Sequence, residues 1–484
     1  MHIFDYLVAV EVRELLVILF IIIIALWGYL FSISFKSHIQ IPTIDIRWNN
    51  RDRDRDKYDF TLDKVKKDII NSNNQTHNKN NNNARYNNNY HNKNLHSSSK
   101  VSQKESFQQS LPFVSVIVPA RNEEKYIQRC LLSILTQNYH NFEVIVLDDN
   151  STDNTLKIIS DIKKDKSKSL PVDRLKVISL NGKPDDWAGK TWAANQGYLH
   201  SSANILLFTD ADTNYVNKNV ISLTVSYMQN RNLDVLTAIV SSERLDNFWA
   251  NSVIPLWNLV KVLFGVSIGD VNNPNSKIAY LMGSFFIIKR KVFEDIGTFA
   301  SVRGAIQEDK ALAVRIKRNG YKLQLVRLKE MISSPWPRDL SSLWYGIGRT
   351  LAPLVIRNKF KIIINLLIIF LISVLPFIVF PYTFSIAIHH FSSLNLESVF
   401  QFDFFYLLLL NIICCLIVIS SSIVKCRMHK LSSVYSLMTF FAAIFLTVAS
   451  LYNIIPLLIG GKTKPIKWRG REYRYDKEQE GFSI

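Results

Sequence analysis

Two acidic pairs in the middle of the chain have the types and spacing for chemistry. Asp210 and Asp212 flank one alanine directly after the apolar run 205–208, so both carboxylates can turn toward one hard cation. Glu308 and Asp309 are adjacent, and a carboxylate placed there could act as a general base. Taken alone, a solvated turn explains the first pair and dipole-favoured carboxylates at a helix start explain the second. Their significance depends on what surrounds them.

The elements that must position these side chains alternate along the chain. Buried strands are predicted at residues 114–118, 142–147, 175–179 and 205–208. Helices are predicted from about 123 to 135, from the end of the acidic turn at 148–153 to about 162, and from 191 to 200. Ser151 or Thr152 is expected to cap the second of these helices. This alternation predicts an α/β domain with a parallel, doubly wound sheet, whose ligands bind beyond the carboxyl ends of the strands.

Further motifs follow these strands in a fixed order. They are Val-Pro-Ala-Arg-Asn-Glu-Glu at 118–124, Leu-Asp-Asp-Asn-Ser-Thr-Asp at 147–153, Gly-Lys-Thr-Trp-Ala-Ala-Asn-Gln-Gly at 189–197, Gly-Ser-Phe-Phe at 283–286 and Gln-Glu-Asp-Lys-Ala-Leu-Ala at 307–313. With the Asp-Ala-Asp triplet, this order resembles family 2 glycosyltransferases, which have a Rossmann-like, mostly parallel GT-A fold. A narrower likeness, carried by 184–190, the C-terminal hydrophobic block and 467–473, is to the hopanoid-associated and carotenoid glycosyltransferases.

The resemblance implies a nucleotide-sugar donor, a UDP-sugar, and assigns residues to it. Those that would line the nucleotide pocket are Pro119, Arg121 and Glu123. Asp148 or Asp149 would contact uracil or ribose. Lys190 would reach the nucleotide or its diphosphate, where a point positive charge is suited.

The resemblance also implies the reacting groups. Asp210 would face the ribose or diphosphate and, with Asp212, hold Mg²⁺ or Mn²⁺. Asp309 would be the general base that deprotonates the acceptor hydroxyl, giving inversion at the sugar. Residues placed near the acceptor or diphosphate are Gly283, Ser284, Glu308, Trp344 and Arg349. The last two fit an amphipathic interface helix with a snorkelling arginine at least as well.

One departure from the wider superfamily bears on the product. Processive polysaccharide synthases carry a Gln-x-x-Arg-Trp motif after the base, and this sequence has none. The sequence therefore favours single transfers to a lipid or isoprenoid-type acceptor. Two alternatives stay open: a processive synthase, and a catalytically inactive scaffold that binds nucleotide sugars.

Composition places this domain in a membrane protein. The chain has 484 residues, and uncharged apolar runs at 15–35, 362–384, 404–424 and 431–458 exclude a purely soluble protein. Four cysteines are too few for a disulfide framework, which favours a cytosol-facing protein. The net charge is +18, and much of the positive charge flanks the apolar runs, so it indicates anionic lipids and not nucleic acid.

The expected organisation is a multi-pass cell-membrane protein with a cytosolic catalytic domain. The boundaries are an anchor at 1–36, a disordered Asn-rich linker at 37–111, the GT-A domain at 112–335, an interfacial segment at 336–360, a transmembrane region at 361–461 and a basic tail at 462–484. Four full spans would put that tail outside. Either the last run, which contains Pro456, is re-entrant, or one segment lies flat in the interface.

Overall fold

In the computed structural model, the chain divides into two compact units, which are described separately. The residues that the structure describes are 2–44, 112–165, 170–243, 248–263, 268–305, 307–392, 400–429, 431–458, 466–468 and 471–473. The first unit is built mainly of helices from the two ends of the chain, and the second contains the large sheet. The expected linker at 37–111 falls almost wholly outside the described residues.

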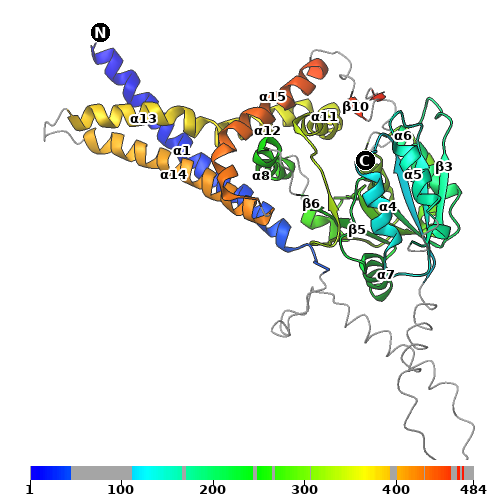
Figure 1. Ribbon diagram of the computed structural model, residues 1–484. Helices are drawn as coiled ribbons and strands as arrows, with labels where there is room; N and C mark the ends of the chain where they lie inside the picture. Colours follow the sequence, from blue (N-terminus) through cyan, green and yellow to red (C-terminus); the bar gives the residue numbers. More distant parts are fainter. Residues whose placement is uncertain are drawn as a thin grey trace, which may run out of the picture. The chain divides into compact units, whose positions relative to one another are not determined.

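A sheet that includes β3 and β5, both labelled in Figure 1, forms the centre of the second unit. It has seven strands in the order β3-β2-β1-β4-β7-β5-β8. Its strands are β1 (Val114–Ala120), β2 (Phe142–Asp148), β3 (Leu175–Ser179), β4 (Ile205–Thr209), β5 (Val235–Ile239), β7 (Phe285–Lys289) and β8 (Leu323–Arg327). Strand β7 runs antiparallel to both of its neighbours, β4 and β5, and the other pairs are parallel. The mostly parallel α/β sheet is therefore confirmed, and β7 is the exception to the parallel pattern.

Helices connect and cover these strands. They are α4 (Ile127–Leu135), α5 (Thr155–Lys163), α6 (Gly189–Leu199), α7 (Val220–Asn230), α9 (Arg290–Asp295) and α10 (Glu308–Arg318). Short 3₁₀ turns lie at η1 (Val172–Arg174), η2 (Ile268–Asn272) and η3 (Phe299–Val302), and β6 (Ser241–Ser242) pairs with β9 (Ser333–Ser334).

Two local predictions are wrong in an instructive way. The first predicted strand was expected to end before Pro119, but β1 continues through this residue. The pairing of β1 with β2 runs on to Ala120, whereas its pairing with β4 ends at Ile117. The missing N–H of proline therefore breaks no hydrogen bond to β4. Helix α5 follows Asn154, and neither Ser151 nor Thr152 caps it. The hydroxyl of Ser151 instead accepts a hydrogen bond from the backbone N–H of Asn122 in another loop.

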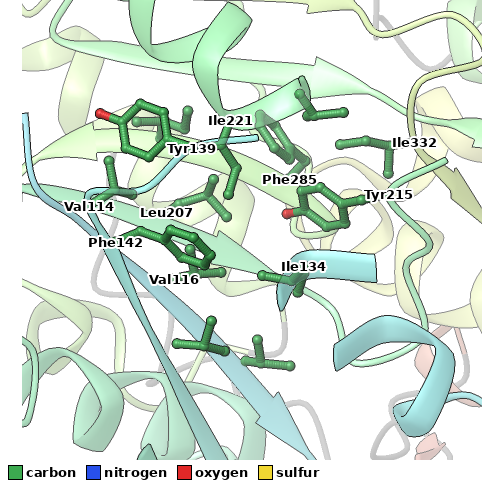
Figure 2. Close-up of a cluster of buried hydrophobic side chains, with 14 of the residues drawn as sticks. Val114, Val116, Ile134, Tyr139, Phe142, Leu207, Tyr215, Ile221, Phe285 and Ile332 are labelled. Carbon is green, nitrogen blue, oxygen red and sulfur yellow. The ribbon is translucent and has the colours of Figure 1, made fainter. Parts of the chain in front are cut away.

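The main core lies on one face of the sheet (Figure 2). Alternate residues of β1, such as Val114 and Val116, point into it beside Leu207 of β4 and Phe285 of β7. Residues of α4 and α7, including Ile134 and Ile221, belong to the same core. The period of two along each strand thus sends its other residues to the opposite face.

Helix α6 packs against that opposite face, and Gly197 sets how closely. A Cβ atom at this position would lie 2.4 Å from Cγ2 of Ile117 and 2.8 Å from Cδ2 of Leu147. Only a glycine lets the helix approach strands β1 and β2 at this depth. The close contact fixes the N-terminal end of α6, where Lys190 lies, against the carboxyl ends of the strands.

The first unit contains α1 (His2–Ile39), α8 (Phe248–Leu263), α11 (Leu340–Arg357), α12 (Lys359–Ser373), α13 (Leu375–Ser392), α14 (Phe400–Met428), the 3₁₀ turn η4 (Ser433–Met438) and α15 (Thr439–Leu458), with a hairpin of β10 (Ile466–Trp468) and β11 (Arg471–Tyr473). Among the described residues, four segments are long and apolar enough to cross a membrane: Val12–Ile39, Lys359–His389, Phe405–Met428 and Ser433–Asn453. They match the four apolar runs of the sequence.

Side chains along these helices share one apolar core. Phe20 and Trp27 of α1 are buried with Leu366 of α12, Cys414 of α14 and Leu446 of α15. Many large apolar side chains on the same helices are exposed, as expected for surfaces that face lipid. Helix α15 continues through Pro456.

Candidate active site

Three charged side chains from three elements meet beyond the carboxyl end of β4. Lys190 lies in the first turn of α6, Asp210 directly follows β4, and Glu308 is the first residue of α10. Nζ of Lys190 is 2.7 Å from Oδ1 of Asp210 and 3.1 Å from Oε1 of Glu308. The side chains are 23%, 32% and 13% exposed, so the cluster is accessible but largely shielded from water.

Asp309 joins this cluster through Gly283. The backbone N–H of Gly283 donates to Oδ2 of Asp309 at 3.3 Å, and that of Lys310 donates to Oδ1 at 2.8 Å. A Cβ atom on Gly283 would lie 2.9 Å from Nζ of Lys190 and 3.2 Å from Oδ2 of Asp309. The glycine therefore leaves room for an ammonium and a carboxylate side by side.

The carboxylates determine the charge state of the lysine. Burial by itself would lower the pKa of Lys190, but the negative charges of Asp210, Glu308 and Asp309 outweigh it and raise the pKa above its ordinary value. Lys190 is therefore an ammonium at physiological pH. The cluster carries three carboxylates for one cation, which gives it an excess of negative charge.

Buried hydroxyl groups hold the loop that carries Asp210 and Asp212. The hydroxyl of Thr213 donates to the carbonyl of Asp210 at 2.8 Å, and it lies 2.9 Å from that of Thr209, which donates to the carbonyl of Ser284. The thiol of Cys130 reaches the same Asp210 carbonyl at 3.6 Å. Burial raises the pKa of Cys130 to about 12, so this thiol stays protonated and is a weak donor.

Arg129 of α4 contacts the second aspartate of the loop. Its guanidinium donates to the backbone carbonyl of Asp212 at 3.4 Å and forms an ion pair of 2.8 Å with Glu243. Glu243 in turn accepts a hydrogen bond of 2.9 Å from the hydroxyl of Ser333. The Asp-Ala-Asp loop is thus supported from both ends by side chains that the sequence analysis did not single out.

A second set of contacts joins the loops after β1 and β2. Nη1 of Arg121 donates to the backbone carbonyls of Asp149 at 2.5 Å and Asn150 at 2.6 Å. Asn122 and Asn150 adopt positive φ values of 53° and 54°, which asparagine tolerates better than most residues. Oδ1 of Asn122 accepts from the N–H of Thr152 at 2.8 Å. The two loops therefore behave as one polar surface at the end of the sheet.

The acidic residues of this surface are almost fully buried. Glu123, Asp148 and Asp149 are 7%, 3% and 2% exposed. Oδ2 of Asp148 accepts from the N–H of Ser151 at 3.2 Å, while its buried Oδ1 has no hydrogen-bond partner within the described part of the chain. A buried acceptor left in this way is suited to an N–H donor of a ligand.

The entry to α6 is tied to the segment before α10. The backbone N–H of Ala188 donates to the carbonyl of Arg303 at 2.7 Å, and the guanidinium of Arg303 lies 2.8 Å from Asp186. Trp187 packs edge-to-face on Trp192 with a centroid distance of 5.2 Å. These contacts hold the 184–190 segment, and with it Lys190, near the residues that lead to Asp309.

The structure brings most of the predicted residues to one edge of the sheet. A narrow hollow there is lined by Pro119, Lys190, Gly283 and Glu308 with the apolar residues Ala194, Phe208, Phe286 and Phe299. Ser284 contributes its backbone carbonyl, which accepts from Thr209. A larger open hollow of about 430 Å³ lies beside Arg129 of α4 and Asn214, and it shares no lining residue with the narrow one.

Two predicted residues lie in the other unit. Trp344 is in α11, where its ring packs on Phe445 and Tyr452 of α15 at centroid distances of 5.6 and 5.3 Å. Arg349 is also in α11, and its side chain falls outside the described part of the structure. Their assignment to the acceptor or the diphosphate stays a prediction.

The supporting residues Arg129, Cys130 and Thr213 were missed by the sequence analysis. Thr213 stands three residues after Asp210, a spacing at which a hydroxyl reaches back to a backbone carbonyl, so a local signal existed. Arg129 and Cys130 are more than 75 residues away in sequence from the loop that they contact, and no local pattern indicates this.

The donor set at Asp210 and Asp212 fits a divalent cation of the Mg²⁺ or Mn²⁺ type. Both contribute carboxylate oxygen, the ligand that such hard cations prefer. No group of three or more His, Cys, Asp or Glu side chains suited to a metal is found among the described residues. The protein would therefore supply few ligands, as is usual where phosphate oxygens and water complete the shell.

The mostly parallel sheet, with acidic side chains at its carboxyl edge, defines an α/β domain of the GT-A class. Residues 115–297 match the sequence model of the family described as Glycosyl transferase family 2. Over these residues the chain is therefore similar to family 2 glycosyltransferases, and the resemblance seen in the sequence is confirmed.

Curated relatives also resemble part of this chain. The protein named "Probable glycosyltransferase YdaM" of Bacillus subtilis is 28% identical over 44% of this chain and 49% of its own length. "Beta-monoglucosyldiacylglycerol synthase" of Nostoc is 32% identical over 30% of each chain. "4,4'-diaponeurosporenoate glycosyltransferase" of Staphylococcus aureus is 33% identical over 24% of this chain and 28% of its own. This chain thus spans less than half the length of these relatives.

Solved structures also resemble this chain. One is a mannosyltransferase from Pyrobaculum calidifontis, in complex with GDP-Man and Mn²⁺. It is 16% identical, covers 72% of this chain and 88% of its own, and has a TM-score of 0.41.

Proposed function

We propose that this protein is a membrane-bound, inverting glycosyltransferase that transfers a sugar from a nucleotide donor, a UDP-sugar, to a lipid or isoprenoid-type acceptor. The observation that carries the proposal is the meeting of Lys190, Asp210, Glu308 and Asp309, from three separate elements, at the carboxyl edge of the sheet. Ligands of such sheets bind at that edge.

The loops after β1 and β2 are suited to the nucleotide. Oδ1 of Asp148, buried and without a hydrogen-bond partner among the described residues, can accept an N–H of a pyrimidine base. Arg121 fixes the backbone next to Asp149, which can then receive the ribose hydroxyls. Pro119 of β1 lines the narrow hollow beside Lys190, and Glu123 lies in the loop after β1, so both are assigned to the nucleotide in this proposal.

The diphosphate belongs beside Lys190. Its ammonium offers a compact positive charge in a site partly shielded from water, where an ionic contact is stronger than on an open surface. A divalent cation held by Asp210 and Asp212 would supply charge neutralisation for the departing nucleotide diphosphate. Thr213 and Arg129 keep the backbone of these two aspartates in place.

Asp309 is placed to act as the base. Two backbone N–H groups orient its carboxylate, which therefore cannot turn away from the cluster without losing both bonds. In the transfer step it takes the proton of the acceptor hydroxyl, while that oxygen forms a bond to the anomeric carbon. The bond from this carbon to the diphosphate oxygen breaks, and its electron pair leaves with the nucleotide. Attack from the face opposite the leaving group inverts the configuration.

The helices of the first unit support a lipid acceptor. Four segments have the length and hydropathy to cross a membrane, so the polar donor would arrive from water and the acceptor from the bilayer. Relatives named for a glucosyldiacylglycerol and for diaponeurosporenoate support an acceptor of this class. The catalytic domain faces the cytosol in this proposal, in agreement with the positive charge that flanks the apolar runs.

The test uses the full chain in nanodiscs with lipid extract, Mn²⁺ and a panel of radiolabelled nucleotide sugars. We expect one labelled glycolipid of single-sugar mass, formed faster from a UDP-sugar than from a GDP-sugar. Labelled polymer would indicate a processive synthase. Absence of transfer and of donor hydrolysis with every donor would refute the enzyme and favour a scaffold that binds nucleotide sugars.

A further inference from the structure

Besides its proposed contact with the donor, Lys190 forms ion pairs with acidic residues of the site itself. Its ammonium bonds directly to Asp210, which is also a proposed cation ligand, and to Glu308. We propose that Lys190 is the resident counter-cation of the acidic site, which opposes binding of a divalent cation until a diphosphate draws it away from Asp210. This inference rests on the proposed function, because it takes Asp210 as a cation ligand and the diphosphate as the anion.

The geometry confines the ammonium to the carboxylates. Nζ lies 2.7 Å from Asp210 and 3.1 Å from Glu308, on the side where Gly283 leaves just enough space for it. An ammonium at hydrogen-bond distance from two carboxylates keeps its proton near neutral pH, so the site keeps this positive charge.

Charge balance gives the direction of the effect. A divalent cation that approaches Asp210 in the donor-free protein meets an ammonium already bound there, and the two like charges repel. A bound diphosphate offers Lys190 another anion and adds negative charge for the cation. The cation and the donor should therefore strengthen each other's binding, and by linkage each must do so by the same factor.

Removal of the ammonium should have opposite effects on the two ligands. Without it, Asp210 and Glu308 have no positive neighbour of this kind, so the donor-free site attracts a cation more strongly. The diphosphate loses a positive partner, so the donor binds more weakly. A lysine that served the donor alone would leave donor-free cation binding unchanged, and one that only supported the fold would weaken both.

The experiment measures Mn²⁺ binding to the purified full chain in detergent by the electron paramagnetic resonance signal of free Mn²⁺, without nucleotide and with saturating UDP. For Lys190→Met and Lys190→Gln we expect donor-free Mn²⁺ affinity to rise about fivefold or more. UDP should tighten Mn²⁺ binding in the unchanged protein and much less in these variants. Lys190→Arg, which keeps the charge, should not show the rise.

Lys176→Met is the matched control, because Lys176 also forms a close ion pair, 2.6 Å from Glu143, outside this cluster. It should leave Mn²⁺ binding unchanged. Equal or weaker donor-free Mn²⁺ affinity in both folded Lys190 variants would overturn the proposal, as would failure of UDP to tighten Mn²⁺ binding in the unchanged protein. Since no sugar is transferred in this assay, a protein that shows the Mn²⁺ effects but never glycosylates a lipid would refute the proposed enzyme alone.

Discussion

The backbone N–H of Gly283 points at Asp309 and holds its Oδ2 at 3.3 Å, although 26 positions separate the two residues in sequence. Gly283 precedes β7, the antiparallel strand next to β4, and Asp309 lies in the first turn of α10. The antiparallel strand thus brings its entry loop to the edge where the parallel strands end. The reversed direction of this one strand therefore brings the proposed base, Asp309, close to the loop that carries the proposed cation ligand Asp210.

Asp309→Asn tests the base. The amide can still accept from Gly283 but cannot take a proton, so transfer should fall by about 10²–10⁴-fold while UDP binding is unchanged. Labelled sugar on lipid and UDP titration measure the two quantities. Asp295→Asn, at a surface carboxylate that accepts from Tyr321, is the control and should keep full activity. Full activity of Asp309→Asn would exclude this residue as the base.

Thr213→Val tests the support of the Asp-Ala-Asp loop. Loss of the hydroxyl removes the hydrogen bond to the Asp210 carbonyl, and a cation site with a loosened ligand loop should need about tenfold more Mn²⁺ for half-maximal transfer. At saturating Mn²⁺ much of the rate should return. Thr213→Ser keeps the hydroxyl and should behave as the unchanged protein. An unaltered Mn²⁺ requirement in Thr213→Val would contradict this role.

Gly197→Ala tests the close packing of α6. The added methyl group would overlap Ile117 and Leu147, so the domain should lose about 1–3 kcal/mol of unfolding free energy. Urea unfolding followed by circular dichroism measures the loss. Leu199→Ala, on the same helix with a side chain that is 61% exposed, should change stability by less than about 0.5 kcal/mol. Equal stability of the two variants would count against the packing argument.

Glu143 should make stability depend on pH at the acid side. Burial by itself would raise its pKa, but hydrogen bonds from Lys176, Ser115 and Ser202 outweigh it and hold the pKa below the ordinary value of 4.5. Its contribution is therefore complete above pH 4.5, where the unfolded chain is also ionised, and disappears as the pH falls through the folded value.

Glu143→Gln should accordingly cost roughly 1–3 kcal/mol at pH 7, and the difference from the unchanged protein should shrink as the pH falls below 4.5. Urea unfolding at pH 7 and at pH 4 checks both statements. A difference that stays constant or grows on acidification would show that the carboxylate is not held in its charged form by these bonds.

The sequence predicted the strands of the first half of the sheet well, because short buried runs between polar turns admit few alternatives. Its errors occurred where partners from other loops decide the outcome. Ser151, expected to cap a helix, accepts from Asn122 instead, and Pro119 stays within a strand because its neighbour on one side has already ended. Such effects depend on chain segments that are distant in sequence.

For the site, the sequence by itself determined which carboxylates and which lysine follow the strands, because residue type and spacing are local properties. It also determined the apolar runs that match the four long helices. Only the tertiary structure decided that Lys190 bonds to both Asp210 and Glu308, that Gly283 makes room for it, and that Arg129 and Cys130 hold the aspartate loop. These contacts join elements far apart along the chain, and they exist because a sheet with one reversed strand brings the ends of those elements to a single edge.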